Sequence, residues 1–160
     1  PDIYSKTIQV EGPQSNLFYV GPIDGGDFKN FEFKVDVYTY PGSTSGIYFH
    51  TRYRNDGRPV YGYEAQINSS RRGESKTGSL VGVSEVNTTP HNDNEWFTYY
   101  IKVDGKKVTI KINDEIVNEF TEQDEAEGPD SLRRGTIAFE STGARKTRVE
   151  FRNPMIRLLQ

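Results

Sequence analysis

Apolar and polar residues alternate along several segments of the chain. Between Phe31 and Tyr38, phenylalanine and valine occupy every odd position, and charged residues occupy the even positions up to Asp36. The segments 108–113 and 149–152 alternate in the same way. A period of two residues is typical of a β-strand that buries one face. The pattern therefore predicts strands along much of the chain.

Turn residues separate these segments. Asp104-Gly105 lies between two alternating runs and predicts a two-residue hairpin, and Asn113-Asp114 predicts a second one. No segment has the length and spacing expected of a helix. The predicted strands cover residues 5–10, 16–20, 29–40, 46–54, 61–68, 78–83, 96–104, 107–113, 115–121, 135–141 and 146–159. Many strands joined by short turns predict an all-β sandwich or barrel.

Two longer segments, residues 68–77 and 121–134, are predicted as loops. Long loops in a compact β domain often form the rim of a functional site, with an ordinary surface loop as the alternative. The 160 residues fit a single domain, 1–160. Because the chain starts with Pro1 rather than Met, we expect a processed product or a piece excised from a longer protein.

The composition excludes several kinds of site. There is no cysteine, which excludes disulfides and thiolate-bound metals. The 20 basic and 23 acidic residues give a net charge of −3, without the basic excess that nucleic-acid binding requires. Two histidines are too few for a His-rich metal site, although one His with carboxylates can hold a divalent cation, so no cofactor is predicted with certainty. The apolar runs are too short to span a membrane.

Strand alternation also assigns side chains to faces. Each predicted strand has an apolar set for the core, which leaves the alternate residues on the outer face. On the strands 46–54, 61–68 and 135–141, this outer set comprises Tyr48, His50, Arg52, Glu64, Gln66, Asn68 and Glu140. Paired donors and acceptors beside an aromatic ring suit the hydroxyl groups of a sugar. The alternative is an ordinary polar sheet face with cross-strand ion pairs.

Five segments follow one another in the order of a known domain family. They are Thr44–Tyr53, similar to a "NSGIYFHT" strand, Gly62–Asn68, similar to "GYEVQI", Lys76–Leu80, similar to "KTGSLY", Asp93–Phe97, similar to "DNEWF", and Phe151–Arg157, similar to "FRNIKIR". Together they resemble the 3-keto-disaccharide hydrolase domain family. The resemblance implies a concanavalin-like jelly-roll sandwich of two antiparallel sheets, exported to the periplasm or cell surface of a bacterium.

The resemblance also implies a reaction on an oxidised di- or oligosaccharide. A ketone at C3 of the sugar acidifies the C2 proton, a base removes this proton, and the group on C1 departs by elimination before water adds back. Glu64 is then the candidate base or acid, and His50 its catalytic partner because its pKa lies near working pH. The candidate substrate-binding residues are Tyr48, Arg52, Gln66, Asn68, Lys76 and Glu140.

Three segments depart from the family pattern. The early "LFNGKDLSGW" segment of the family is not recognisable before Asp27, and Val81 stands where a Tyr often follows "TGSL". Where the family has "LQ.H", this chain has Phe139-Glu140-Ser141-Thr142, without the histidine. An altered site implies either a different substrate or a domain that binds sugar without cutting it. Three alternatives therefore stay open: a glycoside hydrolase or lyase of 3-keto-sugars, a non-catalytic carbohydrate-binding module on the same scaffold, and a structural domain of a larger exported protein.

Overall fold

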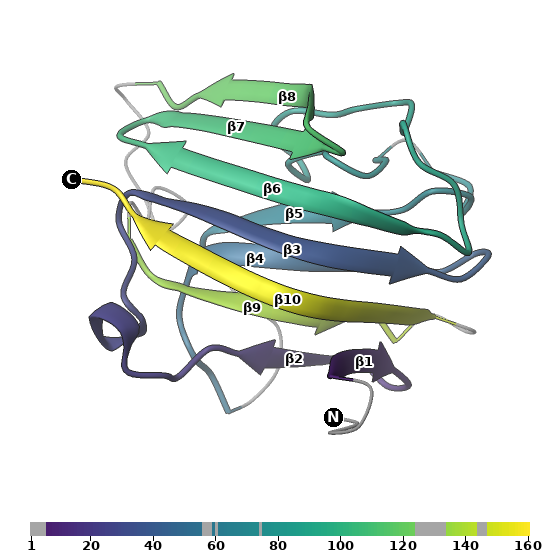
Figure 1. The fold of residues 1–160 in the computed structure, drawn as a ribbon, viewed down its shortest axis with the longest axis horizontal. Coiled ribbons are helices and arrows are strands. Elements are labelled where there is room, and N and C mark those ends of the chain that lie inside the picture. Colours follow the sequence, from purple (N-terminus) through teal and green to yellow (C-terminus); the bar gives the residue numbers. More distant parts are fainter. Residues whose placement is uncertain (1–5, 56–58, 60, 74, 124–133, 144–146) are drawn as a thin grey trace.

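Two antiparallel sheets pack face to face in the computed structural model, which describes residues 6–55, 59, 61–73, 75–123, 134–143 and 147–160 (Figure 1). The six-stranded sheet has the order β1-β10-β3-β6-β7-β8, and the four-stranded sheet has the order β2-β9-β4-β5. The strands are β1 (Thr7–Glu11), β2 (Ser15–Phe18), β3 (Phe31–Thr39), β4 (Ser45–Thr51), β5 (Tyr63–Ile67), β6 (Trp96–Asp104), β7 (Lys107–Ile112), β8 (Glu115–Thr121), β9 (Thr136–Ser141) and β10 (Arg148–Leu158). The predicted all-β sandwich of two antiparallel sheets is confirmed.

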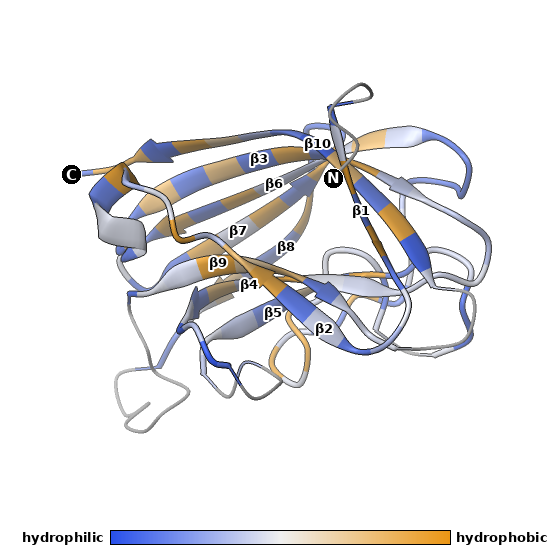
Figure 2. Ribbon diagram, turned by 90° about the horizontal axis from the view of Figure 1, so that it is seen from below, coloured by the Kyte–Doolittle hydropathy of each residue, from blue (hydrophilic) through white to orange (hydrophobic). Residues whose placement is uncertain are grey.

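The core lies between the two sheets and is built by alternate residues of each strand. On β3, Phe31, Phe33, Val35 and Val37 are buried and the alternate residues between them are not, which matches the alternation in the sequence. Figure 2 shows this as hydrophobic and hydrophilic bands that alternate along the strands. Across the core, the rings of Phe139 on β9 and Phe151 on β10 stack with centroids 4.1 Å apart, so they join the two sheets directly.

Strand ends agree with the sequence prediction to within about three residues, with one exception. Residues 78–83 form no regular strand. Leu80 makes isolated bridges to Ala65 and to Ser84, and residues 81–83 between them form a turn. The segment still pairs with β5, since the amide of Gln66 donates to the carbonyl of Ser79 at 2.9 Å. The irregular segment therefore covers the edge of the four-stranded sheet at β5, in the place of the predicted fifth strand.

The short 3-10 helix η1 (Ile23–Gly26) was not predicted from the sequence. Asp24 and Gly25 adopt left-handed backbone angles there, which a search for periodic patterns does not detect. No helix among the described residues is long and apolar enough to cross a membrane.

The outer face of the six-stranded sheet is a ladder of stacked aromatic and arginine side chains. The guanidinium of Arg152 lies 3.9 Å from the centre of the Trp96 ring, and Trp96 contacts Tyr38. Tyr38 contacts Tyr40, whose ring is covered by Arg148 at 4.5 Å. The cation–π contacts of the two guanidinium groups with the rings at the ends of this row stabilise the folded sheet.

Buried hydrogen bonds of Thr77 fasten the loop after β5. The Thr77 hydroxyl accepts a hydrogen bond from the backbone N–H of Asn68 at 2.9 Å and lies 2.8 Å from Nε2 of His91. His91 stacks on Phe97, with ring centroids 3.6 Å apart. Burial lowers the pKa of the His91 imidazole below its ordinary value of 6.5. The folded chain therefore favours neutral His91, whose Nε2 can accept the Thr77 proton.

We expect Phe151→Ala to lower the free energy of unfolding by about 3–5 kcal/mol, because it leaves a cavity beside Phe139. Chemical denaturation measures this change. Met155→Ala on the same strand is the control, since Met155 is 56% exposed, and its effect should stay within about 0.5 kcal/mol. Equal losses in the two variants would contradict the role of the stack.

His91 predicts a pH dependence of stability. Because its pKa is lower in the folded state, the unfolded chain binds a proton more readily, and the stabilisation is lost as the pH falls below about 6.5. Between about pH 7 and pH 5, the wild type should therefore lose more unfolding free energy than His91→Gln. Parallel denaturation curves across this range would contradict the prediction.

Candidate functional site

The outer face of the four-stranded sheet brings together several of the residues selected from the sequence. Tyr48 on β4 lies opposite Glu64 on β5 and opposite Ala138 on β9. Gly46, two residues earlier on the same face, lies opposite Gln66. Since direct cross-strand partners point to the same side of a sheet, Tyr48, Glu64 and Gln66 share the surface away from the core.

The carboxylate of Glu64 is held against the neighbouring strand β4 on this face. Its Oε2 accepts a hydrogen bond from the Tyr48 hydroxyl at 2.8 Å. Its side chain lies over Gly46, where an added Cβ would come within 2.8 Å of Oε1. The glycine therefore makes the space into which Glu64 folds, and the tyrosine orients the carboxylate in it.

Gln66 is bonded from both sides of the sheet. On the outer side, its amide oxygen accepts from the Thr44 hydroxyl at 3.4 Å. On the core side, the hydroxyl of Tyr99 donates to the backbone carbonyl of Gln66 at 3.1 Å. Burial raises the pKa of this tyrosine far above its ordinary value, so it stays protonated as a donor. The strand that carries Glu64 and Gln66 is thus tied to the six-stranded sheet.

Glu140 lies on the same outer face, next to a residue that the sequence analysis did not select. It is 5% exposed and pairs with Asn16 on β2. The side-chain oxygen and nitrogen of Asn16 are buried and make no hydrogen bond. Alternation along the predicted strand 16–20 was the available signal for Asn16, but the sequence does not reveal which strand lies beside β9.

Three other predicted site residues lie in loops or at the end of a strand. Asn68 is buried, and its side-chain amide donates a hydrogen bond to the backbone carbonyl of Ser75 at 2.9 Å. The ammonium of Lys76 donates to the carbonyl of Arg71 at 2.6 Å. Arg52 follows the end of β4 and is exposed. Asn68, Lys76 and Arg52 thus lie apart from the bond between Tyr48 and Glu64: Asn68 and Lys76 bond within the loop, and Arg52 lies past the end of β4.

The predicted face of His50 is wrong. A β-bulge between Tyr48 and Thr51 interrupts the pairing of β4 with β9, and His50 has a left-handed φ of 53°. Its ring is 3% exposed and packs against Phe31, a core residue of the opposite sheet. The bulge thus turns the imidazole to the inner side of the sheet, away from the carboxylate of Glu64.

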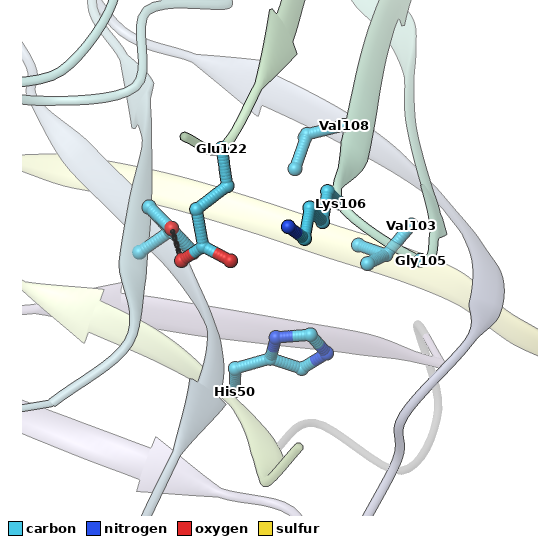
Figure 3. Close-up of a pocket in the computed structure, with 7 residues that line it drawn as sticks. His50, Val103, Gly105, Lys106, Val108 and Glu122 are labelled. Carbon is cyan, nitrogen blue, oxygen red and sulfur yellow. Dashed lines mark hydrogen bonds between the residues drawn. The ribbon is translucent and has the colours of Figure 1, made fainter. Parts of the chain in front are cut away.

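His50 instead belongs to a polar cluster at one end of the sandwich. In Figure 3, His50, Lys106 and Glu122 point toward the same small hollow. The His50 Nε2–H donates to the carbonyl of Lys29 at 2.9 Å, and Tyr63 donates to Glu122 at 2.6 Å. The hollow measures about 10 Å³, which is room for one water molecule and too little for a sugar.

A metal site finds no support among the side chains that the structure describes. No group of three or more histidine and acidic side chains is arranged there to hold an ion. Part of the predicted loop 121–134 lies outside the described residues, since 124–133 are not included. The side chains that the structure describes on the outer face include the carboxylates of Glu64 and Glu140, the amide of Gln66 and the phenol of Tyr48.

Comparisons with known proteins agree with this architecture. The model of the 3-keto-alpha-glucoside-1,2-lyase-like domain family matches residues 10–157. A candidate glycosyl hydrolase from Parabacteroides distasonis has a similar structure, with a TM-score of 0.78 and 20% identity over 96% of this chain and 81% of that one. No curated protein matches the chain.

Two Bacillus subtilis structures share the fold. The carbohydrate-binding module CBM66 has a TM-score of 0.65 and 14% identity, covering 93% of this chain and 85% of its own. A protein of unknown function with a galectin-like fold has a TM-score of 0.64 and 14% identity, covering 92% and 79%. At these identities the likeness concerns the fold.

Gly46→Ala tests whether the glycine places the Glu64 carboxylate. The added methyl group should displace the carboxylate and break its bond to Tyr48, because 2.8 Å is too short for a carbon–oxygen contact. Since the end of a flexible side chain can move away, we expect a stability loss below about 2 kcal/mol. A crystal structure of the variant with Glu64 unmoved would contradict this placement.

Proposed function

The chain belongs to the family of 3-keto-alpha-glucoside-1,2-lyase-like domains, and from this premise we propose that it cleaves 3-keto-glycosides by elimination on the outer face of the four-stranded sheet. Family membership supports a carbohydrate-related function. The observation that carries the finer proposal is the Glu64 carboxylate, which Tyr48 orients over Gly46 on the outer face of the four-stranded sheet.

The proposed reaction needs one carboxylate to move one proton. Glu64 takes the proton from C2 of the 3-keto-sugar, whose ketone stabilises the negative charge that develops. The electron pair of the C2–H bond forms a double bond between C1 and C2, and the C1–oxygen bond breaks. The departing oxygen takes the proton back from Glu64. Water then adds across the double bond, with its hydroxyl on C1, and gives the free 3-keto-sugar.

This route assigns His50 no contact with the substrate, because its imidazole lies on the inner side of the sheet. The Tyr48 hydroxyl keeps the carboxylate oriented while the proton moves. In this proposal the amide of Gln66 donates to the developing enolate oxygen or to a sugar hydroxyl. Glu140 binds a further hydroxyl, and Arg52, Asn68 and Lys76 contribute from the rim.

A second candidate function is a carbohydrate-binding module without catalysis. The inward position of His50 favours it, because the outer face then lacks the imidazole that the family resemblance paired with Glu64. The similar fold of CBM66, a carbohydrate-binding module, agrees with this alternative. Both functions use the same face. We also propose that the protein is exported to the periplasm or cell surface of a bacterium, as the family resemblance implies.

The test is release of nitrophenolate from p-nitrophenyl 3-keto-glucoside. Glu64→Gln should lower the rate by at least about 100-fold, because the amide cannot take up the C2 proton. Its unfolding free energy should stay close to that of the wild type. Glu119→Gln is the matched control, since Glu119 lies on β8 of the other sheet and pairs with Lys107, and its rate should be unchanged.

The outcomes separate the two functions. Release by the wild type and loss in Glu64→Gln support the elimination. If the wild type releases nothing while calorimetry detects binding of the same glucoside, the binding-module alternative replaces it. Full activity in Glu64→Gln would remove Glu64 from the mechanism.

A further inference from the structure

A large apolar cleft opens at one side of the sandwich, away from the Glu64 carboxylate. It measures about 630 Å³, within the range of ligand-binding pockets. Its walls come from both sheets and from η1, and they include Ile8, Leu17, Ile23, Phe33, Phe139 and Ile156. None of the residues that line it is charged. We call this feature the side cleft.

The side cleft leaves part of the core uncovered. Leu17 on β2 pairs with Phe139, so its side chain points between the sheets, yet 51% of it is exposed. Ile23 in η1, which also lines the cleft, is 45% exposed. Inward-facing aliphatic side chains are normally covered, and here the described residues leave about half of Leu17 uncovered.

One rim of the cleft is a strand edge that pairs with no strand among the described residues. β1 pairs with β10 only from Arg148 to Arg152, and a bulge follows at residues 153 and 154. Beyond it, the described part of β10 pairs with β3 alone. The amide of Leu159 donates to the carbonyl of Asn30, so by alternation the backbone groups of Ile156 and Leu158 point away from β3. They face the open edge.

We propose that the side cleft binds an extended, uncharged peptide segment of another polypeptide. The segment adds to the second half of β10 as a strand and places alternate apolar side chains between the sheets. The bound segment would pair with the edge of β10 on the side where β1 pairs with Arg148–Arg152, and it would extend this strand pairing past the bulge. The absence of charged lining residues selects an uncharged segment over an acidic or basic one.

The probe is a fluorescein-labelled, capped heptapeptide of alternating threonine and valine. Fluorescence anisotropy measures its binding, and hydrogen exchange measures protection of the Ile156 and Leu158 amides in the complex. Leu17→Asp should weaken binding about tenfold or more, because it places a charge in the apolar cleft. Val83→Asp is the matched control, since Val83 is 45% exposed in the turn 81–83, and it should bind as the wild type does.

A second peptide separates strand addition from apolar adsorption. It has the same side chains, with N-methyl groups on the amides that would face β10, and should bind at least about tenfold more weakly. Equal binding of both peptides would overturn the proposal, as would no binding up to about 1 mM. Protection of Ile156 and Leu158 that rises with protein concentration alone, together with a dimer in sedimentation, would make a second copy the occupant instead.

Discussion

The antiparallel register of β9, β4 and β5 is the constraint on which the candidate site depends. It places Ala138, Tyr48 and Glu64 side by side in one row, with Gly46 and Gln66 in the adjacent row. Because a strand turns successive side chains to opposite faces, a shift by one residue would bury this polar set and expose Ile47 and Phe49. The core residues of β4 therefore hold the site in register, and the hydrogen bond from Tyr48 orients the carboxylate within it.

The bulge in β4 places the polar side chains of this strand on two different sides of the sheet. Before the bulge, Tyr48 faces outward. After it, His50 faces inward, where it meets Phe31 and the small hollow beside Glu122. Gly62 permits this, because a Cβ there would come within 2.3 Å of the Phe49 carbonyl oxygen. The bulge thus leaves Glu64 and Glu140 on the outer face without the imidazole of His50.

Some strand edges of the sandwich are covered by another segment of the chain, and others pair with none of the described strands. The irregular segment around Leu80 covers β5, and β1 covers the first half of β10. The second half of β10 lies beside the apolar side cleft, and none of the described strands pairs with its outer edge. Open edges of this kind invite pairing with another strand, and proteins usually block them with charge or a covering segment. The side cleft has neither among the described residues, so its chemistry differs from that of the polar sheet face.

The sequence alone predicted ten of the strands, both hairpins and the outward direction of Tyr48, Glu64 and Gln66, because a two-residue period is a local property of the chain. It wrongly predicted a further strand over 78–83. It did not determine that Asn16 lies beside Glu140, since neighbouring strands in a sheet come from distant parts of the chain. It also assigned His50 to the wrong face. Only the tertiary structure decides a bulge, because the extra residue arises from the mismatch between two paired strands and from the space left by Gly62. The open side cleft is likewise a property of how the two sheets meet.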